Sequence, residues 1–132
     1  MSKQPKTIVV VEDEPDTAEM FAEMARLVGY QVHKSFGGIR AIDLIADKKP
    51  AAVLLDVMMP DLSGLEVLRF LRRDPRLAAI PVIIVSAKGL PTDIKDGLDA
   101  GAEVYLTKPV AFADLKAALE RVTANAESHP NQ

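Results

Sequence analysis

Polar and charged side chains follow four of the five short apolar runs in this sequence. The residues concerned carry carboxylates, hydroxyls and one ammonium: Glu12 and Asp13, Asp56, Ser86, and Thr107 with Lys108. Each residue alone has an ordinary explanation, because acids often begin helices, serines can end strands and lysines are usually solvated. Their joint arrival after apolar runs is much harder to explain by capping. The pattern therefore indicates one shared site.

Three of these residues, Glu12, Asp13 and Asp56, would bring their negative charges close together if their apolar runs are strands of one sheet. Such a cluster either raises a pKa strongly or requires a cation. The sequence has no cysteine and no clustered histidines, which argues against zinc. A few carboxylates with room for water favour magnesium over calcium. The sequence therefore predicts a Mg²⁺ site.

Phosphoryl transfer is the reaction that fits these residues in the presence of Mg²⁺. A carboxylate such as Asp56 can act as a nucleophile and form an acyl phosphate. The metal and the ammonium of Lys108 would neutralise charge on the phosphoryl oxygens, while Ser86 would supply a hydroxyl donor. We therefore expect Asp56, Ser86 and Lys108 to carry the chemistry.

The elements that must position these residues alternate along the chain. The five apolar runs, several of them rich in Val and Ile, cover residues 7–11, 30–33, 52–55, 81–85 and 103–106. Their nearly continuous apolar character is typical of strands covered on both faces. Segments with helical spacing lie between and after them, at residues 15–28, 39–47, 65–73, 92–98 and 111–124. The glycines and prolines around residues 92–98 lower helix propensity, so we expect that helix to be mobile.

Alternation of strand and helix predicts an α/β fold with right-handed crossovers and a doubly wound sheet. We expect five parallel strands in the flavodoxin-like order 2-1-3-4-5, with five helices on both faces. Ligands of such sheets bind outside the carboxyl ends of the strands, where the polar residues are predicted to lie. One domain is expected at residues 1–124, followed by a polar tail at 125–132 that we predict to be disordered.

Bulk composition excludes several other classes of protein. The 132 residues are 48% hydrophobic and 27% charged, with a net charge of −3. No cationic surplus points to nucleic acid or a membrane surface, so protein partners are favoured. No signal peptide or membrane span is recognisable. We expect a cytoplasmic protein that contacts neither nucleic acid nor membrane.

The motifs resemble the receiver domains of bacterial two-component response regulators, over nearly the whole chain. They are Val-Val-Val-Glu-Asp-Glu-Pro at 9–15, Leu-Leu-Asp-Val-Met-Met-Pro at 54–60, Gly64, Ser-Ala at 86–87, and Leu-Thr-Lys-Pro at 106–109. The resemblance implies that Asp56 is the phosphoacceptor. It also implies that Asp13, Asp56 and the backbone carbonyl of Met58 bind Mg²⁺, with Glu12 acting through water.

The same resemblance implies how the protein signals. A histidine kinase or a histidine phosphotransfer protein would supply the phosphoryl group, and Ser86 and Tyr105 would act as the switch residues. The chain ends soon after its last predicted helix, as in stand-alone receivers, so its own surface would bind a downstream protein. That surface is expected at residues 92–98, 103–106 and 111–124, on a monomer or weak homodimer. Such a protein catalyses only phosphoryl transfer to its own Asp56 and its own dephosphorylation.

Two details of the motifs carry expectations of their own. Met58, two residues after the acceptor, offers no acid or amide to orient an attacking water, so the phosphorylated state should be long-lived. Met58 could instead merely pack on the rim of the site with Met59. The resemblance also implies a cis peptide bond between Lys108 and Pro109.

Three other functions compete with this interpretation. A haloacid-dehalogenase-like phosphatase would need a second aspartate at the position of Met58. A flavodoxin-like nucleotide or flavin carrier would need a phosphate-binding turn, but the acidic turn at Glu12, Asp13 and Glu14 repels phosphate. A degenerate receiver that only binds partners would lack some of the site residues. Phosphorylation by a small phosphodonor with Mg²⁺ would distinguish the last alternative.

Overall fold

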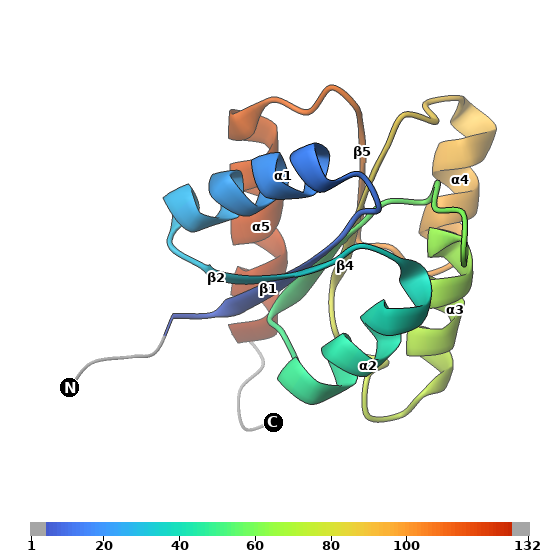
Figure 1. Ribbon diagram of the computed structural model, residues 1–132, viewed down its shortest axis with the longest axis horizontal. Coiled ribbons are helices and arrows are strands. Elements are labelled where there is room, and N and C mark those ends of the chain that lie inside the picture. Colours follow the sequence, from blue (N-terminus) through green and yellow to red (C-terminus); the bar gives the residue numbers. More distant parts are fainter. Residues whose placement is uncertain (1–4, 128–132) are drawn as a thin grey trace.

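The computed structural model describes residues 5–127, and the fold it shows is the predicted doubly wound α/β sheet. Within that range five parallel strands lie in the order β2-β1-β3-β4-β5 (Figure 1). The strands are β1 (Thr7–Val11), β2 (Gln31–Ser35), β3 (Ala52–Leu55), β4 (Val82–Ser86) and β5 (Val104–Thr107). The helices are α1 (Pro15–Val28), α2 (Gly38–Lys48), α3 (Gly64–Arg73), α4 (Pro91–Asp99) and α5 (Phe112–Glu127).

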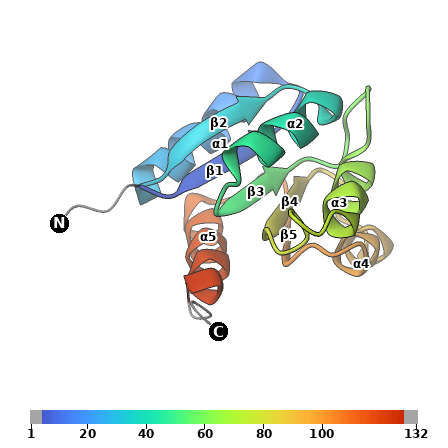
Figure 2. The ribbon, with the colours of Figure 1, turned by 90° about the horizontal axis from the view of Figure 1, so that it is seen from below.

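Helices cover both faces of the sheet (Figure 2). Alternate residues of the central strands face opposite layers. In β1, Ile8 and Val10 pack with α1 and α5, whereas Val9 and Val11 pack with α2 and α3. Every residue of β3 and β4 is buried. This burial on both faces explains why the sequences of the central strands are apolar at nearly every position. No helix within residues 5–127 is both long enough and apolar enough to cross a bilayer.

The predicted strands and helices are all present, and their bounds differ by a few residues. Strand β2 continues to Ser35, β4 includes Ser86 and β5 includes Thr107, so these polar residues end their strands rather than follow them. Helix α5 extends to Glu127, beyond its predicted end at residue 124. The rest of the predicted tail, residues 128–132, lies outside the described residues.

Local signals fix the first helix directly behind the acidic turn. The side chain of Glu14 caps α1 by accepting a hydrogen bond of 2.7 Å from the backbone N–H of Thr17. Pro15 occupies the first turn, where its missing N–H costs nothing. Gly29 ends the helix with a φ of 114°, a left-handed conformation that favours glycine. The turn that contains Glu12 and Asp13 is therefore held between a buried strand and a capped helix.

Candidate functional site

Backbone hydrogen bonds at the carboxyl ends of the strands position the polar residues. The N–H of Asp56 donates to the carbonyl of Val11 at 3.0 Å, so the loop that begins at Asp56 leaves β3 beside the end of β1. The N–H of Lys108 donates to the carbonyl of Ser86 at 2.8 Å, which aligns the end of β5 with that of β4. Residues far apart in sequence thus meet at one edge of the sheet.

The predicted acidic cluster forms at this edge. Glu12, Asp13 and Asp56 each place a carboxylate oxygen so that the three atoms lie within 4.8 Å of one another. Glu12 and Asp56 are only 2% and 4% exposed, whereas Asp13 is more accessible. Two of the three charges are therefore shielded from water, which makes their repulsion strong.

Lys108 is the cation that enters this cluster. Its ammonium donates to Oε1 of Glu12 at 2.7 Å and lies 3.4 Å from Oδ2 of Asp56. The bond between Lys108 and Pro109 is cis, which confirms the expectation from the motif. Lys108 thus bridges Glu12 and Asp56 and is closer to Glu12.

The pKa values of two groups reflect this crowding. Burial raises the pKa of the Glu12 carboxyl; the hydrogen bond from Lys108 opposes this rise and the charge of Asp56 adds to it. Burial lowers the pKa of Lys108, but the hydrogen bond to Glu12 and the charges of Asp56 and Glu12 outweigh burial and raise it. One ammonium does not balance three carboxylates, so the donor set suits a hard divalent cation. The residues present therefore fit Mg²⁺.

Met58 contacts the Asp56 side chain through its backbone. Its N–H donates to Oδ1 of Asp56 at 3.0 Å, which holds the carboxylate in the loop. The Met58 side chain is half exposed, while the neighbouring Met59 is buried. Behind this loop, Gly64 donates its N–H to the carbonyl of Val57 at 3.0 Å. The loop that begins at Asp56 is therefore anchored to the start of α3, and the Met58 thioether is partly exposed to solvent.

Ser86 and Tyr105 both bond to the backbone of Lys88. The hydroxyl of Ser86, which is fully buried, accepts a hydrogen bond of 3.1 Å from the N–H of Lys88. The hydroxyl of Tyr105 donates to the carbonyl of Lys88 at 2.6 Å. Burial raises the pKa of Tyr105. Tyr105 is thus partly buried in this structure, with its hydroxyl directed at the segment that follows β4.

Two tertiary contacts in the structure around the site are not visible in the sequence. The sequence marks Gly97 only as a weak helix residue, but it allows the Tyr105 ring to pack against α4. Asp61 has no predicted role, but its carboxylate accepts hydrogen bonds from the N–H groups of Gly38 and Ile39, both at 3.1 Å. Each contact joins separate elements, so no local pattern could have revealed it.

Comparisons with known proteins agree with this geometry. The family described as the response regulator receiver domain matches residues 8–120. The Phosphate regulon transcriptional regulatory protein PhoB of Pseudomonas aeruginosa is 39% identical over 117 residues, covering 89% of this chain and 51% of PhoB. The Polar-differentiation response regulator DivK of Brucella anthropi is 34% identical over 107 residues, covering 81% of this chain and 87% of DivK. The chain spans about half the length of several curated relatives, PhoB among them.

Solved structures of receiver domains have the same fold. The receiver domain of sensor histidine kinase PA1611 from Pseudomonas aeruginosa, with a magnesium ion in its active-site cleft, gives a TM-score of 0.85 at 30% identity, covering 92% of this chain and 99% of that one. The receiver domain of a histidine kinase from Syntrophus aciditrophicus gives a TM-score of 0.86 at 28% identity, covering 96% of each chain. The similarity therefore includes the whole sheet and the helices around it.

Proposed function

This chain belongs to the response regulator receiver domain family, and from that membership we propose that it is a switch that accepts a phosphoryl group on Asp56. The observation that carries the proposal is the environment of this one carboxylate. Asp56 is buried, lies within an acidic cluster that fits Mg²⁺, and has the Lys108 ammonium 3.4 Å from Oδ2. A buried nucleophile beside a fixed cation is suited to receive a negatively charged phosphoryl group.

In the proposed reaction a carboxylate oxygen of Asp56 attacks the phosphorus of the donor. The new bond gives an acyl phosphate, and the bond from phosphorus to the donor breaks. The leaving group keeps the electron pair; it is the imidazole nitrogen of a phosphohistidine or the acetate oxygen of acetyl phosphate. Lys108 lies close enough to stabilise the added negative charge.

Asp13, Asp56 and the backbone carbonyl of Met58 would hold Mg²⁺, with Glu12 acting through water. When bound, the ion neutralises charge on the phosphoryl oxygens and so favours transfer. The hydrogen bond from Lys108 to Glu12 orients the ammonium before the donor arrives. Glu12 therefore acts as a positioning residue in this proposal.

The readout would pass through Ser86 and Tyr105. If the Ser86 hydroxyl turns to donate to a phosphoryl oxygen, it gives up its bond to the N–H of Lys88. Because Tyr105 is bonded to the carbonyl of the same residue, the segment after β4 couples the two side chains. Phosphorylation then shifts the population of conformations of this segment and of the adjoining helix α4.

The partners would bind at two stages. A histidine kinase or histidine phosphotransfer protein supplies the phosphoryl group, and a downstream protein binds the face formed by α4, β5 and α5. That face already exposes large apolar side chains at Leu90, Leu98 and Phe112. Exposed apolar groups near a segment that changes conformation provide the binding energy that such a partner needs.

Incubation with acetyl phosphate and Mg²⁺, followed by reductive trapping and peptide mass spectrometry, tests the proposal. We expect a single labelled residue, Asp56, and loss of labelling when a chelator removes Mg²⁺. Asp56→Asn is the matched control, because it keeps the size of the side chain and removes the nucleophile. Labelling of Asp56→Asn at the wild-type level would refute the assignment.

A further inference from the structure

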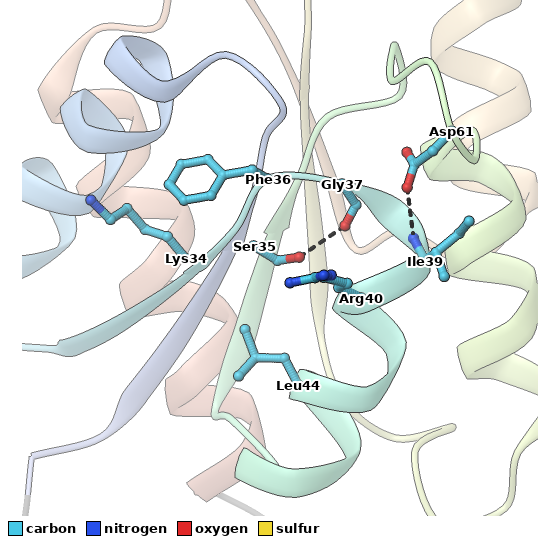
Figure 3. Close-up of a pocket in the computed structure, with 8 residues that line it drawn as sticks. All are labelled: Lys34, Ser35, Phe36, Gly37, Ile39, Arg40, Leu44 and Asp61. Carbon is cyan, nitrogen blue, oxygen red and sulfur yellow. Dashed lines mark hydrogen bonds between the residues drawn. The ribbon is translucent and has the colours of Figure 1, made fainter.

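A groove of about 620 Å³ lies beside the end of β2 (Figure 3), and its lining does not include Glu12, Asp13 or Asp56. Its walls are the end of β2 and the first turns of α2, and the residues used below are Lys34, Phe36, Ile39, Arg40, Leu44 and Asp61. The groove is as large as many ligand-binding cavities. Nothing in the proposed phosphoryl chemistry uses it.

The backbone of β2 is available along the outside of the sheet. β2 is an edge strand that pairs with β1 alone. The N–H of Gln31 donates to the carbonyl of Lys6 at 2.9 Å, and the carbonyl of Ser35 accepts from Glu12 at 3.0 Å. Because backbone groups alternate in direction along a strand, those of Lys34, between them, point away from β1. They can therefore pair with an added strand.

The charges in the groove leave one cation without a counter-ion. Lys34 forms an ion pair with Glu19 of α1. The Asp61 carboxylate accepts hydrogen bonds from backbone N–H groups at the start of α2. Within residues 5–127 no carboxylate lies in ion-pair distance of Arg40, which Figure 3 shows extending into the space between Ser35 and Leu44. A ligand of this groove should therefore carry a negative charge.

Apolar side chains line the same groove. Phe36 is 52% exposed and Ile39 is 60% exposed. Leu44, one turn further along α2 from Arg40, extends the apolar wall. A peptide that is acidic throughout would leave these side chains in water, so the ligand should combine an acidic and an apolar residue.

We propose that the groove binds an extended segment of a partner protein, which adds to β2 as a further strand. Main-chain hydrogen bonds to the outer side of β2 would align the segment. Its side chains would alternate between the two faces of the sheet. An acidic and an apolar residue two positions apart would then both face α2, the acidic one against Arg40 and the apolar one against Ile39 or Leu44.

Selection from a random peptide library displayed on phage tests this proposal. The wild-type protein is the immobilised bait, and an excess of Arg40→Glu protein is present in solution as a competitor. The competitor removes peptides that bind at other surfaces of the protein. We expect the enriched peptides to share an acidic and an apolar residue two positions apart. Failure to enrich any peptide that depends on Arg40 would overturn the proposal.

A synthetic copy of an enriched peptide then separates strand addition from a simple charge contact. Amide shifts in NMR spectra should move at Lys34, Phe36 and Arg40, and affinity should fall roughly tenfold or more in Arg40→Glu. Arg73→Glu, at an exposed arginine near the end of α3, is the matched control and should bind normally. Every second N–H of an added strand points toward β2. N-methylation of that set of peptide bonds should abolish binding, whereas N-methylation of the other set should not. Binding that survives methylation of each of the two sets would refute strand addition.

This inference stands apart from the proposed phosphorylation, and the two can fail separately. Arg40→Glu should still be labelled on Asp56 by acetyl phosphate, which also shows that the variant is folded. Asp56→Asn should still bind the selected peptide. Loss of peptide binding in Asp56→Asn would show that the groove is not an independent site.

Discussion

The ring of Tyr105 lies in the space that a side chain on Gly97 would need. A Cβ atom built on Gly97 would lie 2.7 Å from Cδ2 of Tyr105 and 2.8 Å from Cδ1 of Ile84. Distances this short do not occur between packed carbon atoms. The absence of a side chain at Gly97, in the last turn of α4, therefore allows Tyr105 to reach the carbonyl of Lys88.

Gly97→Ala should expel the Tyr105 ring and break its bond to Lys88. Because burial raises the pKa of Tyr105, an expelled phenol should titrate nearer the ordinary value of about 10. Ultraviolet titration of Gly97→Ala in a Tyr30→Phe background isolates Tyr105, since the chain has only two tyrosines. An unchanged titration curve would show that α4 yields instead of the ring.

Gly64→Ala should distort the loop that begins at Asp56. A Cβ on Gly64 would lie 2.1 Å from the carbonyl oxygen of Asp56 and 2.7 Å from Cα of Val57, and backbone cannot move cheaply. Alanine normally stabilises a helix by roughly 0.5–1 kcal/mol relative to glycine. Here we expect the opposite sign, a loss of about 1–3 kcal/mol in the free energy of unfolding, together with slower labelling of Asp56.

Denaturation with urea and the rate of labelling by acetyl phosphate measure these two effects. Gly29→Ala is a useful control, because Gly29 has a φ of 114° but no atom within 4 Å of the place that a Cβ would occupy. It should destabilise the fold by backbone strain and leave the labelling rate per folded molecule unchanged. Equal labelling rates for Gly64→Ala and wild type would contradict the prediction.

Met58→Glu and Met58→Asn should shorten the lifetime of the phosphorylated state. The wild-type side chain is half exposed beside Asp56, and a thioether is a poor acceptor for an attacking water. A carboxylate or amide there can orient that water, and an acceleration of about tenfold requires only about 1.4 kcal/mol of barrier. Decay of a radiolabel at fixed Mg²⁺ measures the rate. If neither variant changes it, Met58 has only a packing role.

Asp61 should stabilise the fold in a pH-dependent way. Hydrogen bonds from the N–H groups of Ile39 and Gly38 lower the pKa of the Asp61 carboxyl. A carboxyl with a lowered folded-state pKa stabilises the protein above its unfolded pKa, about 3.9, and this stability is lost as the pH falls through the folded-state pKa. Asp61→Ala should therefore be less stable than wild type near neutral pH, with the difference shrinking in acid.

Urea denaturation at about pH 7 and about pH 3 measures this difference. Asp61→Asn retains one carbonyl oxygen and should lose less stability than Asp61→Ala. Asp16→Ala, which removes another exposed carboxylate, provides the matched control for a change in net charge. A difference between Asp61→Ala and wild type that is the same at both pH values would rule out the capping carboxylate as its source.

The order of strands and helices could be predicted from the sequence, because burial and periodicity are local properties of a segment. The central strands are apolar throughout, and Pro15 and Gly29 mark the ends of α1. The bounds of the strands could not be predicted in the same way. Ser86 and Thr107 continue their strands because hydrogen bonding between the strands, and not the polarity of a side chain, decides where pairing ends. The residues of the acidic cluster could also be predicted, since a parallel sheet brings the carboxyl ends of its strands to one edge.

Only the tertiary structure decided how those residues pair. Lys108 and Glu12 are 96 positions apart, and nothing in either local sequence shows that their distance is shorter than that from Lys108 to Asp56. Local sequence likewise does not show that the Tyr105 ring packs against Gly97, or that a groove forms between β2 and α2. Local sequence determines which groups are polar and which segments are buried, whereas distances between separate elements follow from how the whole core packs.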